Sequence, residues 1–294
     1  MSYIQFDKLQ MINLGFSLNR ELLRTNRLGA YTCSTIAFCN TRKYHGLLVC
    51  SIPDFDYENH VLLSSLDETI IQYGAEFNLG IHKYPFIFEP KGHKYIRFCE
   101  FEPIPKITYR VGGVILEKEM LLEENENRLL IKYTLVDAHS PTKLRLKPFL
   151  AFRNVHSLTK ANMEANTHFT KINNGIRIKL YNGFPFLYMQ VSKQNEFVPF
   201  PTWNFNLEYI EEQARGYEYQ EDNFVPGYFE FQIKKGEEII FSAGLEEITP
   251  SGLKRSFNYE LSKKIPRANF EECLRNAAQQ FVVKRGNKTE IVAG

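Results

Sequence analysis

Residues 107–138 read ITYRVGGVILEKEMLLEENENRLLIKYTLVDA, and this stretch decides the fold class. Three runs rich in aliphatic, β-branched and aromatic residues are separated by Gly112-Gly113 and by the polar segment 123–127. Glycine pairs and short polar clusters between such runs are typical of turns in antiparallel sheets. The stretch therefore predicts a three-stranded meander over residues 107–111, 114–122 and 129–136.

The same turn signals recur along the rest of the chain. Asn174-Gly175 tolerates the positive φ angles of a type I′ turn, and Asn182-Gly183 and Lys235-Gly236 repeat the signal. Around the last pair, residues 228–234 and 238–241 are predicted to pair with each other as an antiparallel ribbon. Closely spaced strands with such turns indicate an all-β chain, folded as a large antiparallel β-sandwich, rather than βαβ units.

Two segments depart from this strand rhythm. Residues 197–227 mix aromatic side chains with prolines and acids without a period of two, which predicts an irregular crossing with a short helical turn near 207–214. Near the C-terminus, Asn269 and Glu272 have the spacing of a capping box, which predicts a helix over residues 270–283. The apolar stripe of this helix comprises Phe270, Leu274, Ala277 and Phe281.

The expected organisation is a β-sandwich domain over residues 1–265 and a linker helix over residues 266–294. Pro266, just before the predicted helix, marks the boundary between them. A chain of 294 residues is long enough to bury a core of this size.

The charge balance and the cysteine content of the chain indicate which partners, which compartment and which kinds of site to expect. The 36 basic and 34 acidic residues nearly cancel and are interspersed, so neither nucleic acid nor an anionic membrane is an expected partner. The N-terminus lacks a secretory signal, and the five cysteines lack zinc-type spacing, so we expect a cytoplasmic chain with reduced thiols and no metal site. A neutral substrate suits this balance of charge.

The densest polar cluster is NTRKYHG at residues 40–46, just before the apolar run LLVC. It offers a guanidinium, a phenol and an imidazole, which suit hydrogen bonds to sugar hydroxyls or to a neighbouring carboxylate. The alternative is a loop that is hydrogen-bonded to its own backbone. A similar cluster, RNVHS, follows at 153–157, and Trp203 lies among aromatics that either stack on sugar or belong to the core. The candidate substrate-binding residues are Arg42, Tyr44, His45, Arg153, His156 and Trp203.

No catalytic residue is predicted. Glycoside hydrolysis needs two carboxyls about 5 to 10 Å apart across the bond. The carboxylate pairs of this chain, such as Asp67-Glu68 and Glu221-Asp222, are adjacent in sequence, and adjacent residues in a strand face opposite sides of a sheet.

Several segments of the chain carry a family resemblance. NRELLRTNRLGAY at 19–31, continued by NTRKYHGLLV at 40–49, resembles the opening signature of the N-terminal domain of bacterial and archaeal-type glycogen debranching enzymes. Further stretches fit in order, namely LLSSLDET at 62–69, YRVGGVILEK at 109–118 and LKPFLAFR at 146–153. An ordered series over nearly the whole chain is more specific than any one motif.

The resemblance implies a fold and a function. The fold would be a super-sandwich of the galactose mutarotase type, followed by a linker helix and a helical-barrel catalytic domain. The whole protein would be an amylo-α-1,6-glucosidase, a glycoside hydrolase whose acid and base lie beyond residue 294. This chain would be its non-catalytic domain, and its partners would be α-glucan (glycogen, limit dextrin or malto-oligosaccharide) and the C-terminal catalytic domain of the same polypeptide. No cofactor is implied.

Two alternatives of other classes stay open. One is a free-standing carbohydrate-binding module, and the other is a mutarotase-like sugar isomerase that uses His45 or His156.

Overall fold

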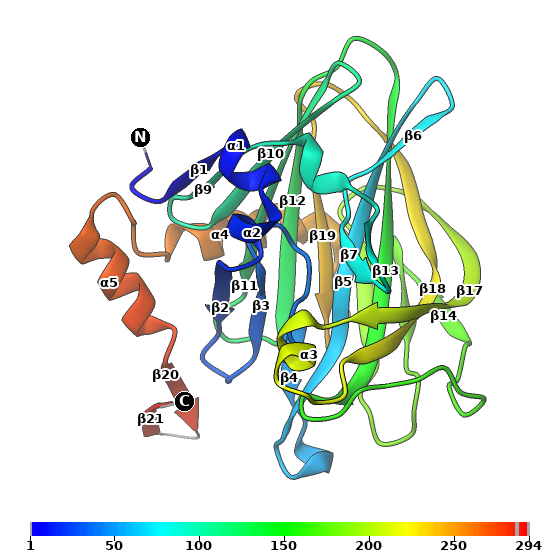
Figure 1. Cartoon of the computed structure of the whole chain (residues 1–294), viewed down its shortest axis with the longest axis vertical. Helices are drawn as coiled ribbons and strands as arrows, with labels where there is room; N and C mark the ends of the chain where they lie inside the picture. The colour runs from blue at the N-terminus through cyan, green and yellow to red at the C-terminus, as the bar shows by residue number, and fades with distance from the viewer. Residues whose placement is uncertain (1, 286–287, 293–294) are drawn as a thin grey trace.

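Two large antiparallel sheets pack face to face in the computed structural model, which describes residues 2–285 and 288–292 (Figure 1). Strands account for 49% of the chain and helices for 15%. The predicted all-β antiparallel sandwich is therefore confirmed. Among the described residues, no helix is long and apolar enough to cross a membrane.

The first sheet has nine strands and contains the predicted meander. Its central strands β10, β11 and β12 pair in succession and cover the three runs expected from the sequence. In spatial order its strands are β1 (Gln5–Asp7), β9 (Ile96–Phe101), β10 (Pro105–Val111), β11 (Val114–Leu122), β12 (Arg128–Asp137), β19 (Glu238–Gly244), β16 (Leu187–Val191), β15 (Gly175–Ile178) and β14 (Phe169–Ile172).

The second sheet has eight strands and carries most of the candidate site residues. In spatial order they are β17 (Glu196–Glu208), β18 (Gln220–Ile233), β13 (Thr142–Asn154), β5 (Asn59–Gln72), β4 (Gly46–Ser51), β3 (Tyr31–Thr35) and β2 (Glu21–Thr25), with β6 (Ala75–Asn78) paired to β5. Two small hairpins lie outside both sheets, β7 (His82–Tyr84) with β8 (Ile87–Glu89) and β20 (Val282–Arg285) with β21 (Lys288–Ile291).

The main hydrophobic core lies between the two sheets. Ile107 and Ile131 of the first sheet and Leu146 and Phe229 of the second belong to it and are fully buried. A buried charged residue also bridges the layers: Glu68 of β5 accepts a hydrogen bond from the Tyr133 hydroxyl and lies 2.7 Å from Lys118 Nζ. Since each of these side chains comes from a different strand, the contact ties the two sheets together.

The predicted ribbon around Lys235-Gly236 is wrong. β18 pairs with β13 and β17 in the second sheet, whereas β19 pairs with β12 and β16 in the first. Gly236 has the positive φ of a turn, 79°, but the turn carries the chain from one sheet to the other. Local turn chemistry predicts the reversal and does not determine which strands pair.

The predicted irregular crossing over 197–227 is also wrong in its main part. Residues 196–208 form the edge strand β17, and residues from 220 onward form β18. The pairing of β17 with β18 shifts register between Pro199 and Thr202 and between Asn204 and Leu207, which breaks the period of two in the sequence. Edge strands tolerate proline and bulges of this kind. The expected helical turn is present as α3 (Ile210–Ala214).

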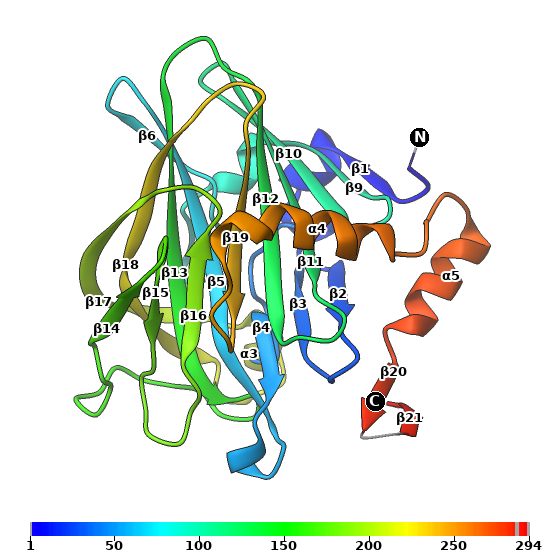
Figure 2. The same cartoon turned by 180° about the vertical axis from the view of Figure 1, so that it is seen from behind.

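Helices lie at the margins of the sandwich. Besides α3 they are α1 (Lys8–Ile12), α2 (Leu14–Ser17), α4 (Leu253–Ser262) and α5 (Phe270–Gln279), with 3-10 turns at Pro53–Phe55, Gly92–Tyr95 and Pro250–Gly252. The sequence interpretation missed α4, which crosses the outer face of the first sheet (Figure 2). Its Leu253 and Phe257 are buried in a small core with Leu121, Leu130 and Ile240.

The predicted C-terminal helix is present as α5 but ends earlier than expected, because β20 begins at Val282. Asn269 caps it by accepting the N–H of Glu272 at 3.0 Å, while the Glu272 carboxylate accepts the N–H of Ala268 instead of closing the capping box. The division of the chain at Pro266 stays a prediction. Residues 286–287 and 293–294 of the expected linker lie outside the described residues.

Candidate functional site

The loop between β3 and β4 places three of the candidate residues at the second sheet. His45, at its end, is almost fully buried, and its Nδ1 accepts the backbone N–H of Thr41 at 3.1 Å. In the neutral ring this bond leaves the proton on Nε2, which lies 3.3 Å from Glu21 Oε1. His45 therefore closes its own loop and holds a carboxylate on β2.

Glu21 is shared between two residues of this loop. Arg42 Nε donates to Glu21 Oε1 at 2.7 Å, on the same carboxylate that His45 approaches. The close approach of His45, together with the hydrogen bond from Arg42, outweighs the effect of burial and lowers the pKa of Glu21 to about 2. The sequence suggested two partners for the Arg42 guanidinium, a sugar hydroxyl or a neighbouring carboxylate. In this structure its partner is the carboxylate of Glu21.

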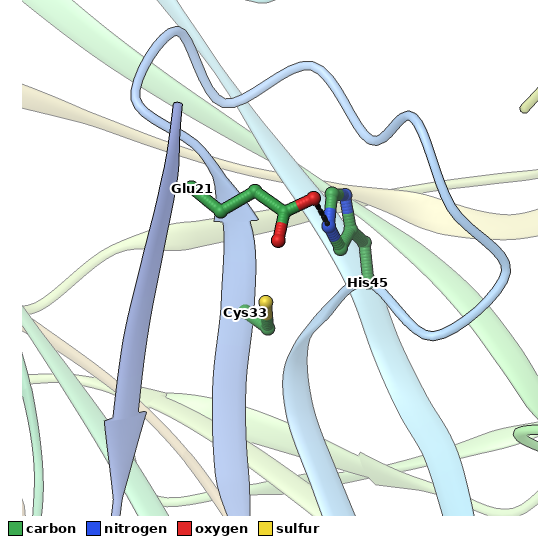
Figure 3. A group of neighbouring side chains, drawn as sticks. All are labelled: Glu21, Cys33 and His45. Atoms are coloured by element: carbon green, nitrogen blue, oxygen red, sulfur yellow. Dashed lines mark ion pairs between the residues drawn. The ribbon is translucent and has the colours of Figure 1, made fainter. Parts of the chain in front are cut away.

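Glu21, Cys33 and His45 also bring three metal-type ligand atoms within 4.8 Å of one another (Figure 3). The chemistry of the cluster does not fit a cation. Nε2 of His45 carries a proton, Glu21 already faces a guanidinium, and burial raises the pKa of Cys33 to about 12, so its thiol stays protonated at neutral pH. The cluster is better described as a hydrogen-bonded clamp on the loop.

Tyr44 and His156 meet although they are far apart in sequence. The Tyr44 hydroxyl lies 3.3 Å from His156 Nδ1, and their rings pack edge to face with centroids 5.6 Å apart. Lys43 Nζ donates to the carbonyl of His156 and lies 5.5 Å from the Tyr44 ring and 5.7 Å from the Tyr217 ring. These four side chains, Lys43, Tyr44, His156 and Tyr217, form what we call the tyrosine–histidine surface.

Arg153 lies beneath this surface. It is buried and forms two hydrogen bonds with the buried carboxylate of Glu221, while its Nη2 also donates to the carbonyl of Lys43 at 2.7 Å. Burial would lower the pKa of Arg153, but the charge of Glu221 outweighs it and raises that pKa. The Tyr209 hydroxyl donates to the same carboxylate. Arg153 therefore supports the loop from below and is not open to a ligand.

Trp203 contacts a different part of the molecule from the other five candidate residues. It packs edge to face on Phe224, 5.5 Å between centroids, and against the main core between the sheets. Tyr44 instead packs on a separate small apolar cluster made of Val49, Val61, Ala151 and Val155. The structure thus brings Arg42, Tyr44, His45, Arg153 and His156 together and places Trp203 with the core.

Comparison with models of known protein families identifies the family of this chain. Residues 20–240 match the family model described as "Glycogen debranching enzyme N terminal". The chain belongs to this family. The resemblance found in the sequence is confirmed, and the debranching-enzyme N-terminal domain includes every candidate site residue.

Solved structures give distant similarities to this debranching-enzyme domain. A bacterial glucoamylase complexed with acarbose aligns over 94% of the chain and 36% of its own length, with a TM-score of 0.38 and 8% identity. A polysaccharide lyase aligns over 78% of the chain and 33% of its own, with a TM-score of 0.30 and 13% identity. The chain thus spans only about a third of each. No curated protein matches the chain.

Three residues of the site in the debranching-enzyme domain were missed by sequence reasoning. Glu21 lies on a neighbouring strand, and Glu221 was considered only as one of several carboxylate pairs. Tyr217 follows α3 and lies beside Lys43 with 55% of its surface exposed. No local signal could have identified them, because each becomes part of the site through contacts between distant segments.

Proposed function

We propose that this chain is the α-glucan-contacting and supporting domain of a cytoplasmic glycogen debranching enzyme whose catalytic domain hydrolyses α-1,6 branch linkages. The observation that carries the proposal beyond the family is the tyrosine–histidine surface. It gathers two phenols, an imidazole and an ammonium from three segments of the chain. Aromatic faces with polar edges suit the alternating apolar and hydroxyl faces of glucose units.

The binding part of the proposal is tested by calorimetric titration with maltoheptaose at millimolar concentration. We expect weak binding that is reduced by Tyr217→Ala, because the ring of Tyr217 is exposed and no buried partner depends on it. Arg42→Ala should also weaken binding, by releasing Glu21 and loosening the loop. Phe205→Ala is the matched control, since Phe205 is an equally exposed aromatic on β17. Absence of heat, or equal affinity in all variants, would refute glucan contact by this surface.

The state of two adjacent carboxylates supports the non-catalytic part of the proposal. Glu221 is bound by Arg153 and Tyr209, and Asp222 accepts backbone N–H groups from Asn206 and Ala161. Neither is free to act as the acid or base of hydrolysis.

A third carboxyl, that of Glu123, is shielded from solvent. Burial raises the pKa of Glu123, a property expected of a general acid, but its side chain is only 6% exposed and accepts a hydrogen bond from Ser256 of α4. A sugar therefore has no access to it. We expect no glucose release from limit dextrin by this chain, and release by a longer protein that includes the catalytic domain. Release by the chain alone, abolished by changing one of its own carboxylates, would overturn the proposal.

A mutarotase-like isomerase remains a second candidate because one histidine is exposed. His156 contacts the Tyr44 hydroxyl at the surface, whereas His45 is buried with its Nδ1 engaged. Polarimetry of freshly dissolved α-glucose tests this candidate. We expect no acceleration of mutarotation, and an acceleration lost in His156→Ala would favour the isomerase instead.

A further inference from the structure

A groove with a cavity of about 410 Å³ is lined by residues of β1 and β9, at one edge of the first sheet, and of β2, at one edge of the second. Leu22 and Phe101 line it from the sheets, Ala277 lines it from α5, and Phe281 lines it from the turn that follows α5. Figure 1 shows α5 standing off from the sandwich on this side. One end of the helix is held in place, because Thr25 N donates to Gln280 Oε1 at 2.8 Å. The groove therefore has fixed, largely apolar walls.

Two arginines in this groove have buried nitrogen atoms that lack hydrogen-bond partners among the described residues. Nε and Nη2 of Arg24 and Nε of Arg267 are buried and make no hydrogen bond within the described part of the chain. Arg24 donates only through Nη1, to the carbonyl of Leu23. Among the described residues, neither arginine has a carboxylate within ion-pair distance, and the Glu21 carboxylate at the rim is taken by Arg42.

The cost of this arrangement shows in the pKa of Arg24. Burial, with a smaller contribution from the charge of Arg267, lowers it to about 9. A buried cation without a hydrogen-bonded anion is destabilising, whereas a carboxylate supplied from outside would relieve both arginines.

The apolar surface extends beyond the groove. Ala277 of α5 lines the cavity, and the apolar stripe of the helix continues from it through Leu274 and Phe270, which are 54% and 63% exposed. Phe281, which the sequence placed on the same stripe, lies beyond the end of α5. Residues spaced by three or four positions lie on one face of a helix. A small molecule that filled the groove would leave this stripe in water, so a protein segment is the better match for the whole surface.

We propose that this groove is the docking site for a protein segment that inserts a carboxylate, flanked by apolar side chains, between Arg24 and Arg267. We expect this segment to belong to the catalytic domain of the debranching enzyme. The identity of the partner is the only part of the inference that rests on the proposed function. The recognition chemistry, a carboxylate among apolar groups, follows from the groove itself.

The test uses a pair of peptides, acetyl-Lys-Leu-Leu-Asp-Leu-Leu-Lys-amide and its counterpart with Asn in place of Asp. We expect the Asp peptide to bind the chain at least about tenfold more tightly, since a buried ionic hydrogen bond distinguishes the two. Amide shifts in NMR spectra should move at Ala277 and Phe281. Arg24→Met and Arg267→Met should each remove the preference, and Arg177→Met, at a buried arginine nitrogen outside the groove, should keep it.

Stability gives an independent readout. Arg24→Met should raise the melting temperature of the free chain, because it removes an unpartnered buried cation; a lower melting temperature would make Arg24 a structural residue and overturn the proposal. If Arg24→Met folds but yields too little protein for the peptide titration, the binding preference is tested with Arg267→Met. Equal binding of both peptides, or a preference that survives both variants, would also overturn it. The proposal would also be overturned if neither peptide bound and the groove bound decanoate but not decanol. That result would assign the groove to a fatty acid. Loss of glucan binding in the earlier titration would leave these outcomes unaffected.

Discussion

Replacement of Arg153 by methionine should destabilise the chain strongly, because it leaves a buried carboxylate without its counter-charge. Glu221 is fully buried and receives two hydrogen bonds from Arg153. After the replacement, the Tyr209 hydroxyl and the N–H of Thr159 remain as neutral donors to the carboxylate. The carbonyl of Lys43 also loses its bond to Arg153, so the loop of the tyrosine–histidine surface loses its support.

The magnitude follows from these contacts. Removal of one partner of a buried ion pair costs about 3–5 kcal/mol, and the two remaining donors place this case at about 3 kcal/mol. For a chain of this size, that corresponds to a fall in melting temperature of roughly 6–12 °C. Arg153→Met/Glu221→Gln should recover most of the loss, since the buried charge is then gone and the amide can still accept from Tyr209.

Urea unfolding followed by circular dichroism measures these free energies. The matched control is Arg145→Met on the same strand, whose partners Glu230 and Glu76 are partly exposed, so its cost should stay below about 1 kcal/mol. A loss for Arg153→Met no larger than that of the control would show that the buried pair contributes little. A double variant that is less stable than Arg153→Met would refute the account based on an uncompensated charge.

Three further outcomes are expected. Glu21→Gln should destabilise the chain at neutral pH and progressively less as the pH falls from 4.5 toward 2, because the lowered pKa of Glu21 makes its charge stabilising only above that window; equal penalties in urea titrations at about pH 7 and pH 3 would contradict this. Lys118→Met should cost about 3–5 kcal/mol in the same urea assay, and Glu68→Gln/Lys118→Met should recover most of it. At about pH 8, Cys33 should react slowly with Ellman's reagent until the chain is unfolded, because burial raises its pKa to about 12; fast labelling of Cys33 in the folded chain would argue against that environment.

The sequence predicted strand pairing correctly where the paired strands are neighbours in sequence and lie in the same sheet. β10, β11 and β12 pair with their neighbours in sequence, so turn signals and apolar runs were sufficient to predict them. β18 and β19 are also neighbours in sequence, but they belong to different sheets. Which sheet a strand joins is decided by the burial of its faces against distant strands, and no turn residue encodes that choice.

α4 was missed for a different reason. Its N-cap, Gly252, makes no side-chain hydrogen bond, so the usual start signal is absent. Leu253 and Phe257 anchor it on the outer face of the first sheet, and its Ser256 and Glu260 make hydrogen bonds with Glu123 and Glu124. These contacts come from residues far away in the sequence. Tertiary packing, rather than local propensity, makes this segment a helix.

The candidate site contains residues that the sequence identified, but the sequence did not reveal what each of them does. Arg42, Tyr44 and His45 were identified because they are adjacent in sequence, and so were Arg153 and His156. Their roles separated only in three dimensions.

Arg153 is the buried support and His156 the exposed partner of Tyr44. A loss of glucan affinity in an Arg153 variant would therefore report on the position of Lys43 and its loop, because the guanidinium is closed off by Glu221. A loss in a Tyr217 variant at unchanged stability would report on contact, since its ring is exposed and anchors no buried group. Measuring stability and affinity together in these two variants separates the support of the surface from the surface itself.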